Sequence, residues 1–234
     1  MSRFRSFYKF LQLSLILGMI IPLFSSCFTV AEQYTVCPKN SVLVASDSKD
    51  IQICVDRFES TLAKSKLGEA FPIASMNYYE CSFHCGKQNK RLLTHNEWLV
   101  ACEGTKAQHC NRDQPHPVLK MLKSEEDWFY NGLDCKDPKN TWRECMQDPR
   151  LNLQEQSLSR NNDFDKCISD HGVQNMVGNL GEWVKDFREE KGQVYGRFNG
   201  GLYPKSNSSC SYTTVAHTLD YKDYSIGCRC AIDL

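Results

Sequence analysis

The stretch from Gly172 to Asp186 contains residue types that could hold a cation. It reads Gly-Val-Gln-Asn-Met-Val-Gly-Asn-Leu-Gly-Glu-Trp-Val-Lys-Asp. Its glycines predict tight turns at Gly178 and Gly181. Its apolar side chains predict an anchor in the protein core; they are Met176, Val177, Trp183 and Val184.

This turn predicts a site made of oxygen atoms. The carbonyl groups of Gly178 and Leu180 can point inward together with the side chains of Asn175 and Glu182. A hard cation such as calcium prefers ligands of this kind. The alternative is a glycine-rich turn whose Trp183 only fills the interior, and spacing alone favours this alternative.

Two pairs of cysteines form a second group with chemical potential. Cys228 and Cys230 lie two residues apart in a predicted strand, with Cα atoms about 7 Å apart, which is too far for a bridge between them. Cys81 and Cys85 lie one turn apart on a predicted helix, so the two pairs can meet as adjacent bridges, with Cys81 bonded to Cys228. The alternative is a zinc site formed by Cys81, His84, Cys85 and Cys228.

Short strands and two helices must position these residues. Alternating apolar residues predict a strand over 51–58 that pairs with 42–44 through a turn at 47–50, so that Cys37 and Cys54 could bridge the pair. Further strands are expected over 193–198 and 225–232.

The two helices are expected at 77–85 and from Thr94 onward. Gly86 would end the first, and Thr94 with Glu97 predicts a capping box for the second, which Gly104 would end. The mixture of helices, short strands and long loops indicates an α+β fold and excludes a regular α/β winding. The polar segment 105–166 is long for a loop, and its cysteines are expected to pin it.

The N-terminus predicts export. Three cations precede an apolar run from Phe10 to Phe24, which is short for a membrane span and typical of a signal peptide. Cys27 follows small residues, as in a bacterial lipobox. We therefore expect residues 1–26 to be removed as a signal peptide and Cys27 to be lipidated. Residues 27–36 would form a tether, and residues 37–234 would form one domain. The alternative is cleavage after Ala31, which would release a secreted protein.

Composition excludes one class of partner. The chain has 234 residues and a formal net charge of zero, and loss of the signal peptide removes cations, so nothing indicates nucleic-acid binding. Thirteen cysteines in an exported chain indicate disulfides. If Cys27 carries lipid, an even number remains.

Three ordered motifs resemble the formylglycine-generating-enzyme family, also called the sulfatase-modifying-factor family. The run Asn175–Val184 is similar to its Asn/Asp-Met-x-Gly-Asn-x-x-Glu-Trp signature, Lys90–Trp98 resembles its Gly-Lys-Arg-Leu-Pro-Thr-x-x-Glu-Trp motif, and Gly227–Ala231 resembles its Gly-Phe-Arg-Cys-Ala terminus. The run from Cys54 to Glu59 resembles a family strand that serves the fold. The resemblance implies a variant of the C-type-lectin-like fold, loop-rich and stapled by disulfides, with a calcium turn.

The resemblance also bears on the disulfides. It implies a bridge between Cys85 and Cys230. The other assignments, made without a geometric argument, are Cys102 with Cys210, Cys110 with Cys167, and Cys135 with Cys145.

The family's known activity is oxidation of a sulfatase cysteine to formylglycine, with copper(I) held by two thiolates shortly after a Gly-Gly-Ser sequence. In the matching stretch Gly200–Cys210, the second thiolate matches Cys210, but Lys205 stands where the first is expected and Leu202 replaces the serine. Since two thiolates are needed to hold this soft metal, we expect no oxidase activity.

Two functions remain open from the sequence. The first is a non-catalytic binding or structural module, anchored by lipid to the bacterial outer membrane or the periplasmic face of the envelope, with an envelope protein or a glycan as partner. The second is a copper-dependent oxidase that uses Cys210 with another sulfur, or a related metal-dependent oxidase with histidine ligands. No two histidines have the spacing of a helical metal site.

Overall fold

The computed structural model describes residues 36–61, 70–111, 151–152, 157–203 and 205–234, and the backbone alone at 129–130 and 133–134. The chain divides into two units, Met1–Tyr34 and Thr35–Leu234, and everything below concerns the second. The predicted signal peptide and Cys27 lie outside the described residues, as do Cys135 and Cys145.

Ten short strands, two α-helices and two 3₁₀ helices make up the regular elements of the described residues. The strands are β1 (Ser41–Ser46), β2 (Ile51–Asp56), β3 (Arg91–Leu92), β4 (Phe129–Tyr130), β5 (Leu133–Asp134), β6 (Gly181–Glu190), β7 (Gln193–Asn199), β8 (Thr213–Thr218), β9 (Ile226–Cys228) and β10 (Cys230–Asp233). The helices are η1 (Asp47–Lys49), α1 (Tyr78–Gly86), α2 (His95–Cys102) and η2 (Ala107–His109).

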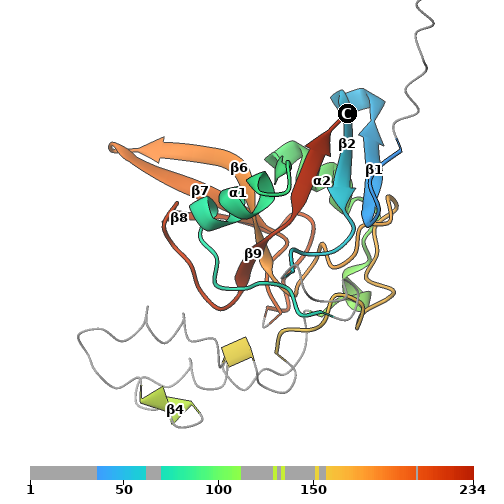
Figure 1. Ribbon diagram of the computed structural model, residues 1–234. Helices are drawn as coiled ribbons and strands as arrows, with labels where there is room; N and C mark the ends of the chain where they lie inside the picture. Colours follow the sequence, from blue (N-terminus) through green and yellow to red (C-terminus); the bar gives the residue numbers. More distant parts are fainter. Residues whose placement is uncertain are drawn as a thin grey trace, which may run out of the picture. The chain divides into compact units, whose positions relative to one another are not determined.

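The strands form two four-stranded sheets and one small hairpin. The first sheet has the order β1-β2-β10-β3, the second has the order β8-β7-β6-β9, and β4 pairs with β5. All pairs are antiparallel except β6 with β9, which is parallel. The predicted pairing of 42–44 with 51–58 is confirmed, and β6 and β7 form a long hairpin (Figure 1). The α+β fold predicted from the sequence is therefore correct.

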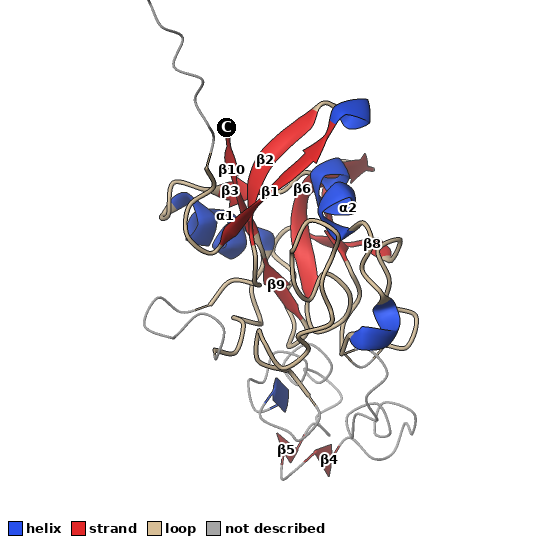
Figure 2. Cartoon of the chain, turned by 90° about the vertical axis from the view of Figure 1, so that its right-hand side faces the viewer, coloured by secondary structure: helices blue, strands red, loops and turns tan. Residues whose placement is uncertain are grey.

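Helix α2 joins the two sheets through the main core. It contacts β1 of the first sheet and β6 and β7 of the second (Figure 2). Its predicted capping box is present, because the Thr94 side chain accepts from the backbone of Glu97 and the Glu97 side chain accepts from the backbone of Thr94. Trp98 and Cys102 are fully buried, and Gly104 follows the helix with φ of 78°.

Helix α1 begins with a second capping box that the sequence analysis did not name. Asn77 accepts from the Glu80 backbone, and the Glu80 side chain accepts from the Asn77 backbone. The helix ends at Gly86, as predicted, but Gly86 does not adopt the left-handed conformation. Lys87 is the C-cap in a right-handed conformation, and the left-handed residue is Asn89, with φ of 55°.

Two predicted boundaries near the central turn are also wrong. The expected single strand 225–232 breaks at Arg229, so β9 belongs to the second sheet and β10 to the first. The predicted tight turn at Gly181 is absent, because β6 begins there. The residues of this stretch with a left-handed backbone, beyond Gly172, are Asn175, Gly178 and Asn179. The predicted anchor side chains are buried, as expected: Met176, Val177, Trp183 and Val184.

Four disulfides crosslink the described part of the chain. They are Cys37–Cys54, Cys85–Cys230, Cys102–Cys210 and Cys110–Cys167, and each pair is one that the sequence analysis proposed. The last of these ties the start of the long polar segment to its end. Among the described helices none is long and apolar enough to cross a membrane.

Candidate functional site

The centre of the predicted cation site is a buried ion pair. Glu182 is the second residue of β6 and is 1% exposed, and Arg229, between β9 and β10, is fully buried. The Nη2 and Nε atoms of Arg229 donate to Oε1 of Glu182 at 2.7 and 3.0 Å. Trp98 Nε1 of α2 donates to Oε2 of Glu182 at 2.7 Å. The Glu182 carboxylate is thus held by donors from two parts of the fold, helix α2 and the link between β9 and β10.

A second buried carboxylate lies beside this pair. Glu59 is 1% exposed, and its Oε2 accepts from Nδ2 of Asn179 at 2.6 Å, while its Oε1 accepts from the backbone of Leu180 at 3.1 Å. Burial raises the pKa of Glu59 to about 8, and the charge of Glu182 raises it in the same direction, against the opposing effect of Arg229. Glu59, Glu182 and Arg229 therefore form one buried polar centre, and its charge depends on the protonation of Glu59.

Two of the four predicted calcium ligands, Glu182 and Asn175, make other contacts in this structure. Calcium is bound by six to eight oxygen atoms. The Glu182 oxygens already accept from Arg229 and Trp98, and a guanidinium beside a cation costs free energy by repulsion. Asn175 donates its amide to the carbonyl of Asn161. Nowhere in the described part of the chain do three His, Cys, Asp or Glu side chains gather as a metal site.

The stretch that matches the family's copper centre has no free thiol. Cys210 is bonded to Cys102 of α2, so its sulfur cannot act as a thiolate. Lys205 is exposed, and its ammonium lies 5.8 Å from the centre of the Tyr212 ring. Leu202, in the place of the serine, is buried at 8% exposure. Neither half of a two-thiolate site is present.

The glycines before this stretch keep their structural role. Gly200 and Gly201 have φ of 90° and 76°, and a Cβ at Gly200 would lie 2.6 Å from the carbonyl oxygen of Met176. Asn199 precedes them in β7, is buried, and its Nδ2 lies 3.0 Å from Nδ1 of His95. Gly200 therefore leaves no room for a side chain beside the carbonyl of Met176.

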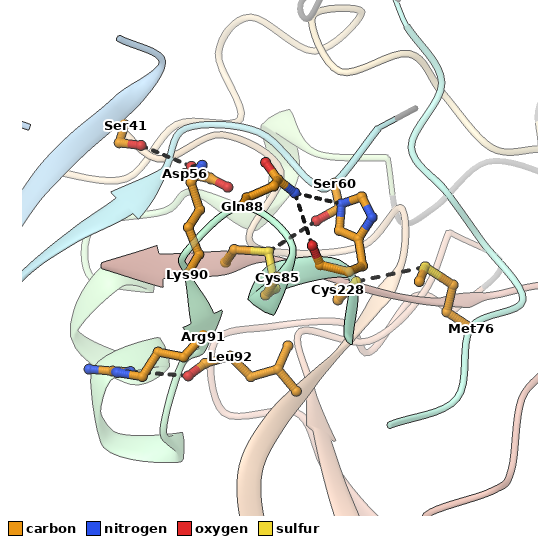
Figure 3. Close-up of a disulfide and its surroundings, with 12 residues drawn as sticks. Ser41, Asp56, Ser60, Met76, Cys85, Gln88, Lys90, Arg91, Leu92 and Cys228 are labelled. Carbon is orange, nitrogen blue, oxygen red and sulfur yellow. Dashed lines mark hydrogen bonds and ion pairs between the residues drawn. A yellow bond between two sulfur atoms is a disulfide. The ribbon is translucent and has the colours of Figure 1, made fainter. Parts of the chain in front are cut away.

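Two predictions about the remaining sulfurs need correction. The zinc site of Cys81, His84, Cys85 and Cys228 is excluded, because Cys85 is bonded to Cys230. The predicted bridge between Cys81 and Cys228 is also absent, and both cysteines are free and buried. The break at Arg229 places Cys228 and Cys230 in different sheets, and Sγ of Cys228 lies 3.8 Å from Sδ of Met76 (Figure 3).

Sequence reasoning missed three members of the polar centre. Glu59 was assigned to a strand that serves the fold, and Arg229 and Trp98 were named only as parts of family-like motifs. Buried charges carry no signal in hydrophobic periodicity. The signal available was that Glu59, Glu182 and Arg229 all fall within the family-like motifs.

The fold and this centre define a class: a disulfide-crosslinked α+β domain with C-type-lectin-like architecture. Residues 28–234 match the family described as the sulfatase-modifying factor enzyme 1-like domain, so the chain belongs to this family. A search of curated protein sequences found no match.

Solved structures share the fold at low sequence identity. The I1 variant of the major tropism determinant is 14% identical, with a TM-score of 0.54, over 85% of this chain and 53% of that one. The structure of CarF is 13% identical, with a TM-score of 0.50, over 85% of this chain and all of that one. This chain therefore spans about half the length of the tropism determinant, and these similarities concern the fold alone.

Proposed function

We propose that this chain is an exported lipoprotein whose family domain is a non-catalytic binding or structural module of the bacterial cell envelope. The observation that carries the proposal is the Cys102–Cys210 disulfide, together with Lys205 at the position of the other copper ligand. A copper site of two thiolates cannot form from a lysine and a bonded sulfur. The domain without a copper site is a fold whose loops are crosslinked by disulfides.

The test of the missing oxidase is an assay for aldehyde formation. The purified protein is incubated with a cysteine peptide, oxygen and cuprous ion, and the peptide mass is followed. We expect no aldehyde product. The variant Cys210→Ser should give the same result as the unchanged protein. Aldehyde that forms with the unchanged chain and disappears in Cys210→Ser would establish the alternative, a copper-dependent oxidase.

The lipid anchor at Cys27 requires a separate test, since the described residues do not include it. We expect the full-length chain, expressed in a bacterial host, to partition into the membrane fraction and the variant Cys27→Ser to lose this partition. Release of both forms into the medium, with a new N-terminus after Ala31, would instead indicate a secreted protein.

The partner is proposed at the level of its class: an envelope protein or a glycan. The support is the combination of the predicted export, a scaffold crosslinked by disulfides and the absent copper pair.

Calcium binding by Asn175, Gly178, Leu180 and Glu182 stays a prediction. Thermal unfolding with calcium and with chelator tests it, and a rise of the midpoint with calcium that Glu182→Ala abolishes would contradict our assignment of Glu182 to the ion pair alone.

A further inference from the structure

One side of the first sheet carries an exposed apolar side chain. Leu43 of β1 lies opposite Cys54 in the β1–β2 pair, so both side chains point to the same side of the sheet. The neighbouring Val44 and Val55 point to the other side and enter the main core, to which α2 belongs. Figure 2 shows α2 on one side of this sheet and α1 on the other. Leu43 therefore lies on the α1 side, where it is 45% exposed.

Helix α1 adds two exposed aromatic rings to this side. Tyr79 is 58% exposed and Phe83 is 67% exposed, and they lie one helical turn apart. Cys81 and Cys85, on the opposite face of the helix, are fully buried. Because the Cys85–Cys230 disulfide ties α1 to β10, the helix cannot rotate to bury its rings. The two rings are therefore a fixed part of the surface.

The chain also enters the domain on this side. Cys37 is bonded to Cys54, which points to the α1 side of the sheet. Val36, directly before Cys37, is 83% exposed. Cys27 lies ten residues before Cys37, and ten extended residues span at most about 35 Å. A lipid at Cys27 would therefore hold the domain close to a bilayer by its α1 side.

Two lysines near these side chains form no ion pair within the described residues. Lys39 follows Cys37 and is exposed, and Lys87 follows α1 with its ammonium 5.0 Å from the centre of the Phe83 ring. In membrane proteins, aromatic rings lie at the level of the lipid headgroups, and lysine side chains extend along apolar surface to place their charge in the polar region. Phe83 and Lys87 have this arrangement.

The carboxylates near these lysines have partners. Asp56 at the end of β2 accepts from Lys90 at 2.6 Å and from Ser41 at 2.9 Å (Figure 3). Glu80 of α1 accepts from Lys222 at 2.8 Å. The unpaired lysines can thus attract anionic lipid headgroups. We call this surface the α1 face, and its members are Val36, Lys39, Leu43, Tyr79, Phe83 and Lys87.

We propose that the α1 face lies on the headgroup region of an anionic lipid bilayer. This deepens the proposed function and rests on it, because the lipid at Cys27 brings the domain to the membrane. Tyr79 and Phe83 enter the boundary between headgroups and acyl chains, and Lys39 and Lys87 pair with lipid phosphates. The short tether, the exposed rings and the unpaired cations, all on one side, favour a bilayer over a protein or a glycan as the occupant of this face.

The measurement is oxidative footprinting of the mature lipidated protein in vesicles of phosphatidylethanolamine and phosphatidylglycerol. Hydroxyl radicals modify rings that water reaches, and peptide masses give a rate for each ring. The matched control is Phe71, which is 50% exposed and packs on Arg160 in a different part of the surface. By exposure alone, Phe83 should react at least as fast as Phe71. On vesicles we expect the reverse order, and Phe83 reacting as fast as Phe71 there would overturn the proposal.

A pair of variants tests whether the Phe83 ring holds α1 at the interface. Phe83→Ser should speed the oxidation of Tyr79 on vesicles, whereas Phe71→Ser should leave Tyr79 slow. Both side chains are exposed, so neither change should unfold the protein, and circular dichroism checks this. Equal rates at Tyr79 in the two variants would contradict the proposal.

The composition of the vesicles tests the role of the lysines. Vesicles of phosphatidylcholine alone carry no net charge, so Lys39 and Lys87 find no anionic surface there and Phe83 should be oxidised faster than on phosphatidylglycerol. The same rate on both kinds of vesicle would contradict the contribution of the two lysines.

The anchor and the α1 face can fail separately. The mass of the mature N-terminal peptide shows whether Cys27 carries lipid. If it carries none, the anchor of the proposed function is wrong, and the released chain is footprinted with and without the same vesicles. Slower oxidation of Phe83 with vesicles would then still support the α1 face. An unchanged rate with vesicles, or slowing by peptidoglycan fragments alone, would overturn it.

Discussion

Arg229 is the residue on which the buried polar centre depends. Its guanidinium is fully buried and pairs with Glu182, which is equally inaccessible. Removal of one partner leaves an uncompensated charge in the interior, which costs about 3–5 kcal/mol. We therefore expect Arg229→Met to lower the free energy of unfolding by about this amount, as measured by urea denaturation.

The control for this variant is an exposed ion pair. Lys49 and Glu103 pair at 3.1 Å with side chains about half exposed, so Lys49→Met should change the free energy of unfolding by less than about 1 kcal/mol. The double variant Arg229→Met with Glu182→Leu should recover part of the loss, because it removes both charges. An Arg229→Met protein as stable as the control would show that the pair does not support the fold.

Glu59 gives the stability a pH dependence whose sign follows from its environment. Its pKa is about 8 in the folded protein and near the ordinary 4.5 in the unfolded chain. Between these values the folded state holds a proton that the unfolded state has released. The contribution of Glu59 is therefore fully present below about pH 4.5 and is lost as pH rises through 8, with a slope of at most about 1.4 kcal/mol per pH unit.

The measurement is the thermal midpoint between pH 5 and pH 8 for the unchanged protein and for Glu59→Gln. We expect a flatter profile in the variant, because glutamine does not titrate. Glu189→Gln, at an exposed position of β6, should keep the original slope. Parallel profiles for the unchanged protein and Glu59→Gln would contradict the raised pKa.

Part of this centre could be predicted from the sequence. The motif around Glu182 indicated a buried polar turn, and its apolar anchors Met176 and Trp183 are where the pattern placed them. The partner of Glu182 could not be predicted, since Arg229 lies far away in the sequence and only the tertiary fold brings it close. Without that partner, the carboxylate was assigned to a metal ion.

At the scale of elements, both helices begin with a capping box. Asn77 with Glu80 caps α1, and Thr94 with Glu97 caps α2. Loss of one N-cap side chain typically costs about 1 kcal/mol. We expect Asn77→Ala and Thr94→Ala each to lower the free energy of unfolding by about that amount in denaturant titrations.

A matched variant inside a helix separates capping from a general effect of alanine. Ser82 is exposed in the middle of α1, and Ser82→Ala should change stability by no more than about 0.5 kcal/mol in either direction. If Ser82→Ala and Asn77→Ala have the same effect, the cap of α1 does not contribute.

The sequence predicted the elements better than it predicted their ends. The helix start at Thr94 and the pairing of β1 with β2 follow from local rules and are confirmed. The division of 225–232 into β9 and β10 does not follow from such rules, because an apolar alternating run can serve one sheet or two. What separates them is the buried side chain of Arg229, whose partners lie in both sheets.

At the scale of the whole molecule, the disulfides close loops of very different length. Cys37–Cys54 spans 17 residues and Cys85–Cys230 spans 145. In the chain-entropy account, the stabilisation grows with the length of the closed loop. Because the Cys102–Cys210 bridge shortens the loop that Cys85–Cys230 closes, the account gives about 3 kcal/mol for the first and about 4 kcal/mol for the second. We expect the double alanine variant of Cys85 and Cys230 to lose more stability than that of Cys37 and Cys54.

Urea denaturation of both double variants, without reductant, measures this difference. The free energy of unfolding of the Cys85 and Cys230 variant should lie about 1 kcal/mol below that of the other, and the cavity left by the two buried side chains adds to the difference. A larger loss from the short bridge would contradict the entropic account for this protein. These disulfides were predictable as a class from the predicted signal peptide and the cysteine content, whereas the sequence did not predict that Cys81 and Cys228 are free.

The position of Arg229 has a consequence for how the domain opens. The same guanidinium donates to Glu182 of the second sheet, to the carbonyl of Asp56 at the end of β2 in the first sheet, and to the carbonyl of Gln174. If either sheet separates from the other, the charge of Arg229 or of Glu182 is left without its partner in a nonpolar interior. Amide hydrogen exchange in β2 and β6 should accordingly report a single opening free energy, with both sheets exchanging as one cooperative unit.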